Sequence, residues 1–277
     1  MLKTILIRYK LVTIVVGAFL TLAIFYLFVG IARPAGNLKG TEINPPSQWQ
    51  SGKITTFDVG TYNIHRAKGV DGVRDIARIA KAIEGLNIVA LQEVGGPTFL
   101  GMPNQVQQLG GLLDIGWLFA PTSVRFGKDK SGTGLLSQFK VNSWRRQQLD
   151  SPINASLRNY LVVKIAIGNK EVVLINTHIH TGVDGMDQLK TVIGEFNKYD
   201  VAILAGDLNT RRQQSPLKEL LGDPKVTDAI KSALGREPPE WNVDWILTRG
   251  LRVVSGKHLE AGASDHPLYS VKLSFLE

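Results

Sequence analysis

The stretch Val201-Ala-Ile-Leu-Ala-Gly-Asp207-Leu-Asn209-Thr210 runs five small or branched apolar residues directly into a glycine, a carboxylate and a carboxamide. A continuous apolar run of this length is typical of a strand that is covered on both faces. An ordinary Asx turn at the strand end is the plain alternative, because Asp and Asn side chains bond their own backbone there. Polar residues of the same kind follow other predicted strands, and this repetition favours a site at the strand ends.

The composition is that of a globular chain, with 277 residues, of which 44% are hydrophobic and 20% charged. This length suffices for one large domain with a buried core. The chain has no cysteine, so disulfides and thiolate metal sites are excluded, and a metal must be held by oxygen or imidazole ligands. The formal charge of +8 favours an anionic partner, although part of the excess lies in an N-terminal flank that membrane topology explains.

Residues 11–32 carry no charge, and at about 1.5 Å of helical rise per residue they would cross a hydrocarbon core of about 30 Å. We therefore predict a single membrane-spanning helix. Lys3, Arg8 and Lys10 precede it in residues 1–10, a bias that favours a cytoplasmic N-terminus and a domain outside the cytoplasm, in the periplasm or at the cell surface. Two alternatives remain open. One is a cleavable signal peptide, although the apolar stretch is longer than the usual core of about 7–15 residues. The other is a nuclease tethered to the cytoplasmic leaflet.

Residues 33–52 are rich in proline and glycine and show no periodicity, so we predict a linker that holds the following domain off the membrane. No break of comparable weight recurs, and residues 53–277 are predicted to form one domain. This domain opens with an alternating stretch, Ile54–His65, that is typical of a strand. A helix follows it, for which Asp71 is the predicted cap.

A second strand, Asn87–Val94, follows that helix directly. Strand, helix and strand in this order predict a parallel pair joined by a right-handed crossover, with Asn63 and Glu93 at the same end of neighbouring strands. A carboxylate at the end of an apolar strand costs free energy unless it is paired or bound to a cation. Glu93 is therefore the first candidate metal ligand.

The same pattern recurs later, with a strand at Glu171–His180, an amphipathic helix, and the strand that begins at Val201. His178 and the pair Asp207 and Asn209 then arrive at matching strand ends, where ligands bind in α/β sheets. A lone strand histidine is more often a satisfied core residue. Its position beside carboxylates favours a functional role for His178.

Six short motifs carry a resemblance to a known family. They are Asn63, Leu91-Gln92-Glu93, Thr177-His178, Gly206-Asp207-Leu208-Asn209, Val243-Asp244-Trp245-Ile246 and Ser264-Asp265-His266. In this order they resemble the motif series of the endonuclease/exonuclease/phosphatase superfamily, which has the deoxyribonuclease I-like fold. The resemblance implies an α/β fold, a four-layer α/β/β/α sandwich with the site at one rim of two packed sheets. It also implies hydrolysis of a phosphoester with a divalent cation, usually Mg²⁺, with Mn²⁺ as the alternative.

Three positions depart from the family pattern. Gly132-Thr133-Gly134 stands where many members have Asn, and His65 stands where the nuclease branch has Asp. His65 argues against transferring an abasic-site nuclease activity directly. His180 has no family role, and a surface or core position is expected for it.

A phosphate ester repels nucleophiles, so its hydrolysis needs a cation on the phosphoryl oxygen, a positioned water and a proton for the leaving oxygen. Glu93 is expected to bind Mg²⁺ with help from Asn63 and Asp265, because hard oxygen ligands suit this ion. Arg158 is a weaker candidate for a phosphate contact, and an exposed loop arginine is the alternative.

The remaining polar residues are assigned to proton transfer and charge stabilisation. Asp207 is expected to orient or deprotonate the attacking water, while Asn209 and His178 donate to the phosphoryl oxygens. Asp244 is expected to hold His266 in the tautomer that proton transfer requires. Which of Asp207 and His266 is the base stays open.

The substrate is also left open between nucleic acid, a lipid or inositol phosphate headgroup and a small phosphate ester. Three basic runs are interpreted mainly as surface charge, namely Arg74/Arg78/Lys81, Arg125/Lys128/Lys130 and Arg145/Arg146. We expect a monomer. The alternative from another functional class is a catalytically inactive, membrane-anchored phosphate-binding module.

Overall fold

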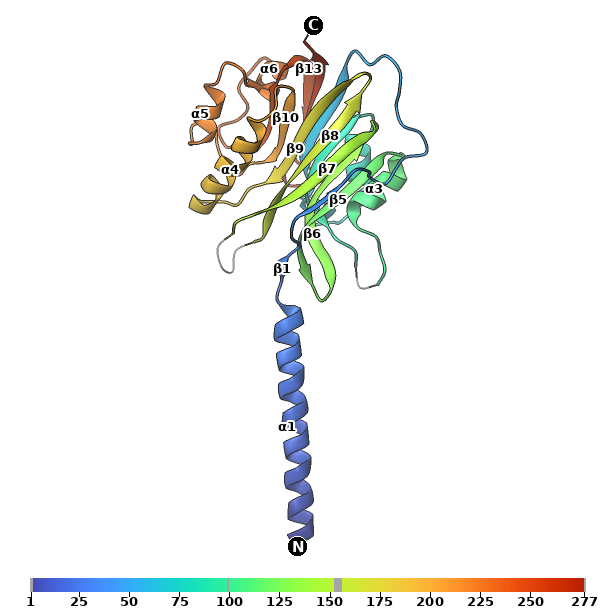
Figure 1. The fold of residues 1–277 in the computed structure, drawn as a ribbon, viewed down its shortest axis with the longest axis vertical. Coiled ribbons are helices and arrows are strands. Elements are labelled where there is room, and N and C mark those ends of the chain that lie inside the picture. Colours follow the sequence, from blue (N-terminus) through green and yellow to red (C-terminus); the bar gives the residue numbers. More distant parts are fainter. Residues whose placement is uncertain (1, 99, 152–155, 277) are drawn as a thin grey trace.

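A computed structural model describes residues 2–98, 100–151 and 156–276. Within these residues the chain forms a long N-terminal helix, α1 (Leu2–Gly30), followed by a domain built on two seven-stranded sheets. Figure 1 shows α1 extending away from one end of the domain, with the C-terminus at the opposite end.

Each sheet contains one parallel pair of strands. The first sheet has the order β1 (Arg33–Pro34), β5 (Gly116–Arg125), β6 (Lys128–Ser137), β4 (Ile88–Gly95), β3 (Phe57–Asn63), β14 (Leu268–Phe275), β13 (Leu251–Leu259). The second has the order β11 (Thr227–Asp228), β12 (Asp244–Arg249), β10 (Ala202–Asp207), β9 (Lys170–His178), β8 (Arg158–Ile167), β7 (Val141–Leu149), β2 (Leu38–Gly40). The parallel pairs are β3 with β4 and β9 with β10, so both predicted crossover units are confirmed.

Alternating side chains sort these strands into layers. Val59 of β3 and Leu174 of β9 belong to one buried cluster, which lies between the sheets. Their neighbours on the opposite faces join outer clusters, as Val173 of β9 does with Leu189. Burying one face between sheets and the other under helices explains why these strands are apolar throughout.

Short helices cover the outer faces of the two sheets (Figure 1). They are α2 (Ile76–Ile83) and α3 (Gln105–Leu113) over the first sheet, and α4 (Val183–Phe196) and α5 (Leu217–Leu221) over the second. A further helix, α6 (Ala229–Leu234), packs against β12, β13 and β14, and a 3-10 turn, η1 (His65–Ala67), follows β3. The predicted four-layer α/β/β/α sandwich is confirmed.

The predicted cap of the first domain helix is wrong. Asp75, not Asp71, caps α2, and its side chain accepts from the backbone N–H groups of Ala77 and Arg78. Asp71 lies one turn earlier, where it accepts from the N–H of Val73 and pairs with the guanidinium of Arg78. Both aspartates suit a helix start, and the turn between them decides which one begins the helix.

Residues 33–52 have the predicted loop composition, but they lie along the domain. β1 pairs with β5 of the first sheet and β2 pairs with β7 of the second. Arg146, interpreted from sequence as surface charge, is buried and donates to the carbonyls of Ala35 (2.8 Å) and Gly36 (2.9 Å). The segment therefore fastens α1 to the domain, with Ile31 and Ala32 alone between α1 and β1.

α1 is a candidate membrane span by length and composition. The stretch Arg8–Tyr26 is apolar, and none of it is buried in the domain. A signal sequence near an N-terminus has the same properties.

Candidate active site

The ends of three neighbouring strands place polar side chains in one row of the second sheet. Asp207, the last residue of β10, is in register with His178 at the end of β9 and with Asp244 at the start of β12. In the first sheet Asn63 ends β3, and Glu93 lies near the end of the parallel neighbour β4. Because the sheets are stacked, these two rows face each other at one rim.

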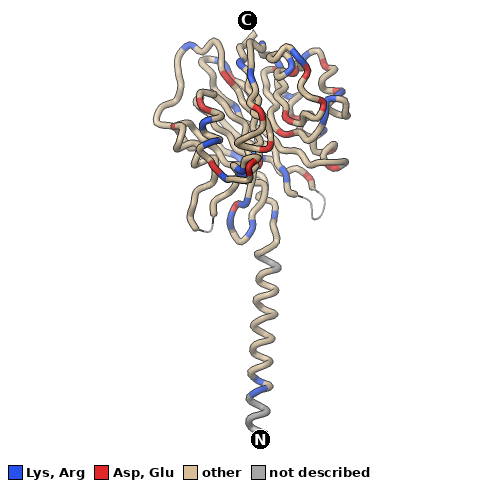
Figure 2. Tube along the Cα trace, turned by 180° about the vertical axis from the view of Figure 1, so that it is seen from behind, with Lys and Arg blue, Asp and Glu red and all other residues tan. Residues whose placement is uncertain are grey.

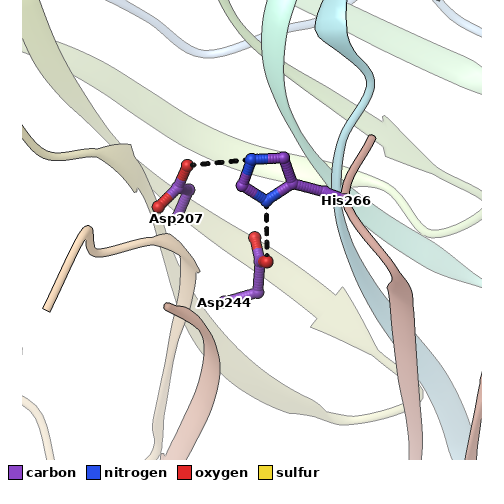
Figure 3. Close-up of side chains that lie close together, drawn as sticks. All are labelled: Asp207, Asp244 and His266. Atoms are coloured by element: carbon purple, nitrogen blue, oxygen red, sulfur yellow. Dashed lines mark hydrogen bonds and ion pairs between the residues drawn. The ribbon is translucent and has the colours of Figure 1, made fainter. Parts of the chain in front are cut away.

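His266 reaches this rim from the segment that precedes β14. The hydroxyl of Ser264 donates to the carbonyl of Asn63 (2.7 Å) and so ties this segment to the end of β3. His266 Nδ1 then lies 2.8 Å from Asp244 Oδ2, and its Nε2 lies 3.8 Å from Asp207 Oδ2 (Figure 3). Asn63 Nδ2, at the end of β3, lies 3.5 Å from the same Nε2, so residues from both sheets contact one imidazole.

Burial and mutual charge shift the pKa values of this group. Burial raises the pKa of Asp207 to about 7, and the nearby charge of Asp244 adds to the shift, while His266 opposes it. Burial also raises the pKa of Asp244, which its hydrogen bond to His266 counteracts. Burial lowers the pKa of His266, but the hydrogen bond and charge of Asp244 outweigh it and raise that pKa to about 9. The protonation of one of these groups therefore alters the pKa values of its neighbours.

Asn63 lies between carboxylates and faces them with its amide N–H group. Its Nδ2 is 3.0 Å from Asp207 Oδ2 and 3.3 Å from Glu93 Oε1, while its Oδ1 accepts from the backbone N–H of His65 (3.1 Å). In this arrangement Asn63 orients the carboxylates. Its Oδ1 accepts this one hydrogen bond and keeps a second lone pair, so the role of Asn63 as a metal ligand stays a prediction.

Glu93 sits in an irregularity of β4. The pairing of β4 with β6 shifts register between Leu91 and Val94, and Glu93 has a φ of +52°. A left-handed conformation at a non-glycine residue costs about 1–3 kcal/mol, and such residues are enriched at active sites. The bulge turns the Glu93 carboxylate toward the neighbouring cleft, where it remains partly exposed.

Asp265 lies at the margin of the site. Its Oδ2 is 3.2 Å from His65 Nδ1, and both side chains are partly exposed. His65, which departs from the family pattern, therefore has a carboxylate partner. Asp265 is adjacent to His266 in the chain, so the segment that delivers the imidazole also delivers this carboxylate.

Besides Glu93 and Asp265, the buried group around His266 could also hold a cation. Among the described residues, Asp207, Asp244 and His266 offer ligand atoms that all lie within 4.8 Å of one another. Two of them are already joined by the short Asp244–His266 hydrogen bond, and both carboxylates are buried. Glu93 is the carboxylate of this site that reaches the cleft.

His178 and Asn209 form the remaining polar corner. His178 Nε2 lies 3.2 Å from Asn209 Nδ2 and 3.4 Å from Asp207 Oδ2. Burial lowers the pKa of His178 well below its usual range, and nearby Arg158 adds to the shift, which favours the neutral imidazole. The Asn209 side chain also donates to the carbonyl of Ile179 (2.9 Å), which fixes its direction.

A cleft of about 780 Å³ opens beside these residues, and its lining is strongly basic. It includes Glu93 and His178 from the site and four cationic side chains, Arg66, Arg125, Lys130 and Arg158. The Nε atoms of Arg125 and Arg158 are buried and find no acceptor within the described part of the chain. A buried, unsatisfied guanidinium N–H is costly, and an anionic ligand in the cleft would satisfy it.

The structure changes two interpretations of basic residues, that of Arg158 and that of the run containing Arg125 and Lys130. Arg158 is the first residue of β8 and a wall of the cleft, so the alternative of an exposed loop arginine is wrong. Burial lowers its pKa, which the charges of Glu93 and Asp207 oppose. Arg125 and Lys130 also line the cleft, although their run was interpreted as surface charge. Both residues flank the turn between β5 and β6, and only the tertiary structure places this turn beside the site.

A polar network inside the sandwich was not predicted. Gln92 Nε2 donates to Asn176 Oδ1 (2.9 Å), and Asn176 Nδ2 donates to the carbonyls of Gly134 (2.8 Å) and Leu91 (3.1 Å). These bonds cross from one sheet to the other directly beneath the site. His180, by contrast, turns its Nδ1 to the carbonyl of Thr181 (2.9 Å) and takes no part in the site contacts described above.

Residues 60–266 match the Endonuclease/Exonuclease/phosphatase family, and the chain belongs to this family of phosphoester hydrolases. No curated protein matches the chain. Among solved structures, an endonuclease/exonuclease/phosphatase from Beutenbergia cavernae is similar at 23% identity with a TM-score of 0.65, over 80% of this chain and 72% of that one. One from Bacteroides vulgatus is similar at 18% identity with a TM-score of 0.64, over 80% and 100%. Humanized D. rerio TDP2 is similar at 16% identity with a TM-score of 0.58, over 79% and 99%. At these identities the likeness shows the fold.

Proposed function

We propose that this protein is a divalent-metal-dependent phosphoester hydrolase that α1 attaches to a membrane. The observation that supports the proposal best is the meeting of Glu93, Asp207, Asp244 and His266 at one rim beside a basic cleft. The pocket accepts an anion, and the rim supplies carboxylates for a cation and an imidazole for proton transfer.

For the metal we propose Glu93 and Asp265 as ligands, with Asn63 in support and with Mg²⁺ or Mn²⁺ as the ion. Carboxylate oxygens suit both ions, and Glu93 faces the cleft where a phosphate would enter. Asn63 orients the Glu93 carboxylate through its N–H group. When bound, such a cation polarises the phosphoryl oxygen and lowers the pKa of a coordinated water.

The buried group serves proton transfer in this proposal. Asp207 orients the attacking water, and the Asp244–His266 pair exchanges the proton that the reaction moves. Asp244 keeps the imidazole in one orientation, because its oxygen lies 2.8 Å from Nδ1 and leaves Nε2 facing the site.

Three donors would contact the phosphoryl oxygens, which carry the negative charge of the phosphate ester. Neutral His178 and the amide of Asn209 lie beside Asp207, where the attacked phosphoryl group would sit. Arg158 borders the same space from the cleft with an unsatisfied Nε–H. An arginine in this position binds phosphate oxygens with directional, charge-assisted hydrogen bonds.

The test is hydrolysis of bis(p-nitrophenyl) phosphate by the purified full-length protein in detergent. We expect p-nitrophenol release that requires Mg²⁺ or Mn²⁺, stops with EDTA and returns when the cation is restored. Release that persists in EDTA would contradict the metal assignment. Phosphate binding without turnover would support the inactive binding module instead.

We also propose that the N-terminus is cytoplasmic and the domain extracytoplasmic. The support is the excess of basic residues before the apolar stretch of α1. Protease is expected to degrade the domain in spheroplasts, in which the cytoplasmic membrane is still intact. Protection of the domain until the cytoplasmic membrane is lysed would reverse the assignment.

A further inference from the structure

The cleft beside the candidate site extends to the end of the N-terminal helix. Its lining joins Glu93, Arg158 and His178 on one side to Ile31 and Ala32 on the other. The latter two are the residues that link α1 to β1. A ligand that enters the cleft therefore passes next to the point where the apolar helix leaves the domain.

The end of α1 is held against the domain at this point. The rings of Tyr26 and Phe126 lie 5.8 Å apart, and a Cβ at Gly30 would lie only 3.2 Å from the Phe126 ring. Arg33 and Pro34 then pair with β5, which ends at the hairpin that carries Phe126. Since two residues separate the helix from this pairing, the cleft stays close to whatever surface α1 enters.

The loops around α1 carry two exposed apolar side chains together with basic and aromatic side chains that are exposed or partly exposed. We call this set the docking rim, and it consists of Leu100, Met102, Arg125, Phe126, Lys128 and Lys130. Leu100 is 94% exposed and Met102 is 54% exposed. Both belong to the loop that follows β4, which points toward the same end of the domain as α1 (Figure 1).

The docking rim is carried by the loop after β4 and by the β5–β6 hairpin, and hydrogen bonds join these two segments. The backbone N–H of Gly96 donates to the carbonyl of Lys130 (2.8 Å), and Lys128 Nζ donates to the carbonyl of Thr98 (3.1 Å). Figure 2 shows the β5–β6 hairpin beside α1 with charged residues at its tip, which are Arg125, Lys128 and Lys130 with Asp129 between the two lysines. Exposed leucine and methionine next to lysine and arginine are typical of a surface that sits at the headgroup level of an anionic membrane.

We propose that the cleft takes its phosphoester from the bilayer that α1 enters, so that the substrate is the phosphate headgroup of a membrane lipid. This inference rests on the proposed hydrolase function. The docking rim contacts the headgroups, Leu100 and Met102 enter the apolar boundary, and the cationic lining of the cleft meets the lipid phosphate.

The shape and chemistry of the cleft favour a headgroup over a nucleic acid. Its volume of about 780 Å³ is that of a pocket for a small ligand. No aromatic side chain is among the described residues that line it, whereas single-stranded nucleic acids stack their bases on aromatic rings. On the α1 side, Ile31 and Ala32 border the cleft with apolar surface.

The position of the docking rim can be measured without any reaction. The chain has no cysteine, so Leu100→Cys gives one labelling site in the full-length protein. Val254→Cys is the matched control, because Val254 is 51% exposed on β13, at the opposite edge of the sheet from β1. Each variant is labelled with an environment-sensitive fluorophore and reconstituted into vesicles of phosphatidylcholine and phosphatidylglycerol.

The label at position 100 is expected to shift to shorter wavelength and to be quenched by lipids that carry a nitroxide just below the headgroup. The label at position 254 is expected to behave as in water. Equal, water-like fluorescence at both positions would overturn the docking of this rim, whether or not the protein hydrolyses any ester.

The substrate is tested with the reconstituted full-length protein and four substrates. These are phosphatidylglycerol and phosphatidic acid in the vesicle, bis(p-nitrophenyl) phosphate in solution, and a single-stranded oligonucleotide. At equal bulk concentration we expect a vesicle lipid to be cleaved at least about tenfold faster than the oligonucleotide, since the tether raises its effective concentration. Faster cleavage of the oligonucleotide would overturn the lipid assignment and leave the hydrolase function standing.

A variant separates docking from chemistry. The double change Leu100→Asp and Met102→Asp is expected to slow cleavage of the vesicle lipid by about tenfold while the soluble diester changes by less than about twofold. Val254→Asp is expected to alter neither rate. Equal loss on both substrates would overturn the role of the rim, and absence of cleavage of any ester would instead remove the proposed function.

Discussion

The units β3–α2–β4 and β9–α4–β10 share one local pattern, a strand, a helix and a parallel strand, with one unit in each sheet. The carboxylates at the ends of the two units lie in different environments. The first delivers Glu93, which a bulge and a left-handed backbone turn toward the cleft. The second delivers Asp207, which is buried and bonded to Asn63 and to the N–H of Asn209.

Under the proposed function, the two carboxylates have different tasks. A carboxylate that reaches a cleft can meet a hydrated cation, whereas a buried one with a raised pKa is suited to holding and passing a proton. Changing one unit at a time tests this division directly.

The largest loss is expected from the buried group. Asp207→Asn and His266→Ala should each lower kcat by about 10²–10⁴, because each removes a group that moves or positions a proton. The Mg²⁺ concentration for half-maximal activity should stay unchanged, which a cation titration of the residual activity measures. A strong shift in that concentration would place the cation in the buried cluster instead.

Glu93→Gln is expected to lower activity by about 10²-fold, and here the Mg²⁺ titration should move to higher concentration. This change removes the charge of the proposed metal ligand and keeps the size of its side chain. Glu84→Gln is the matched control, since Glu84 is an exposed residue at the end of α2, and it should leave rate and titration unchanged. An unaltered Mg²⁺ dependence in Glu93→Gln would refute the proposed ligand.

The two units also differ in how closely neighbouring atoms approach a glycine in one of their strands. A Cβ on Gly206 of β10 would lie 2.0 Å from the carbonyl oxygen of Thr177, with φ at +148°, whereas one on Gly60 of β3 would meet the tip of the Leu86 side chain at 2.7 Å. Backbone cannot yield as a side-chain tip does. Gly206→Ala should therefore destabilise the fold by about 2–3 kcal/mol and Gly60→Ala by less. Thermal unfolding measures both, and equal effects would contradict the close approach.

The smallest effect is expected at the cleft. Arg158→Ala should raise KM for a phosphodiester by about tenfold, the cost of losing a charge-assisted hydrogen bond, with a smaller change in kcat. Arg252→Ala on β13 is the control, because Arg252 is an exposed arginine outside the cleft lining. A larger fall in kcat than rise in KM would move Arg158 from binding into transition-state stabilisation.

The sequence by itself determined the α1 candidate span, the two crossover units and which polar residues end their strands. These are local properties, because a stretch of about 10–20 residues is enough to recognise an apolar run, a turn or a strand end. The motif order across the chain added the sandwich and the phosphoester chemistry.

Only the tertiary structure decided how those residues face one another. The turn of Asn63 toward the carboxylates, the bulge at Glu93 and the network from Gln92 to Asn176 depend on contacts between distant segments. The same holds for Arg125 and Arg158, whose place in one cleft follows from the stacking of two sheets. The end of α1 joins that cleft through the pairing of β1 with β5, a contact between residues about 90 positions apart that no local pattern encodes.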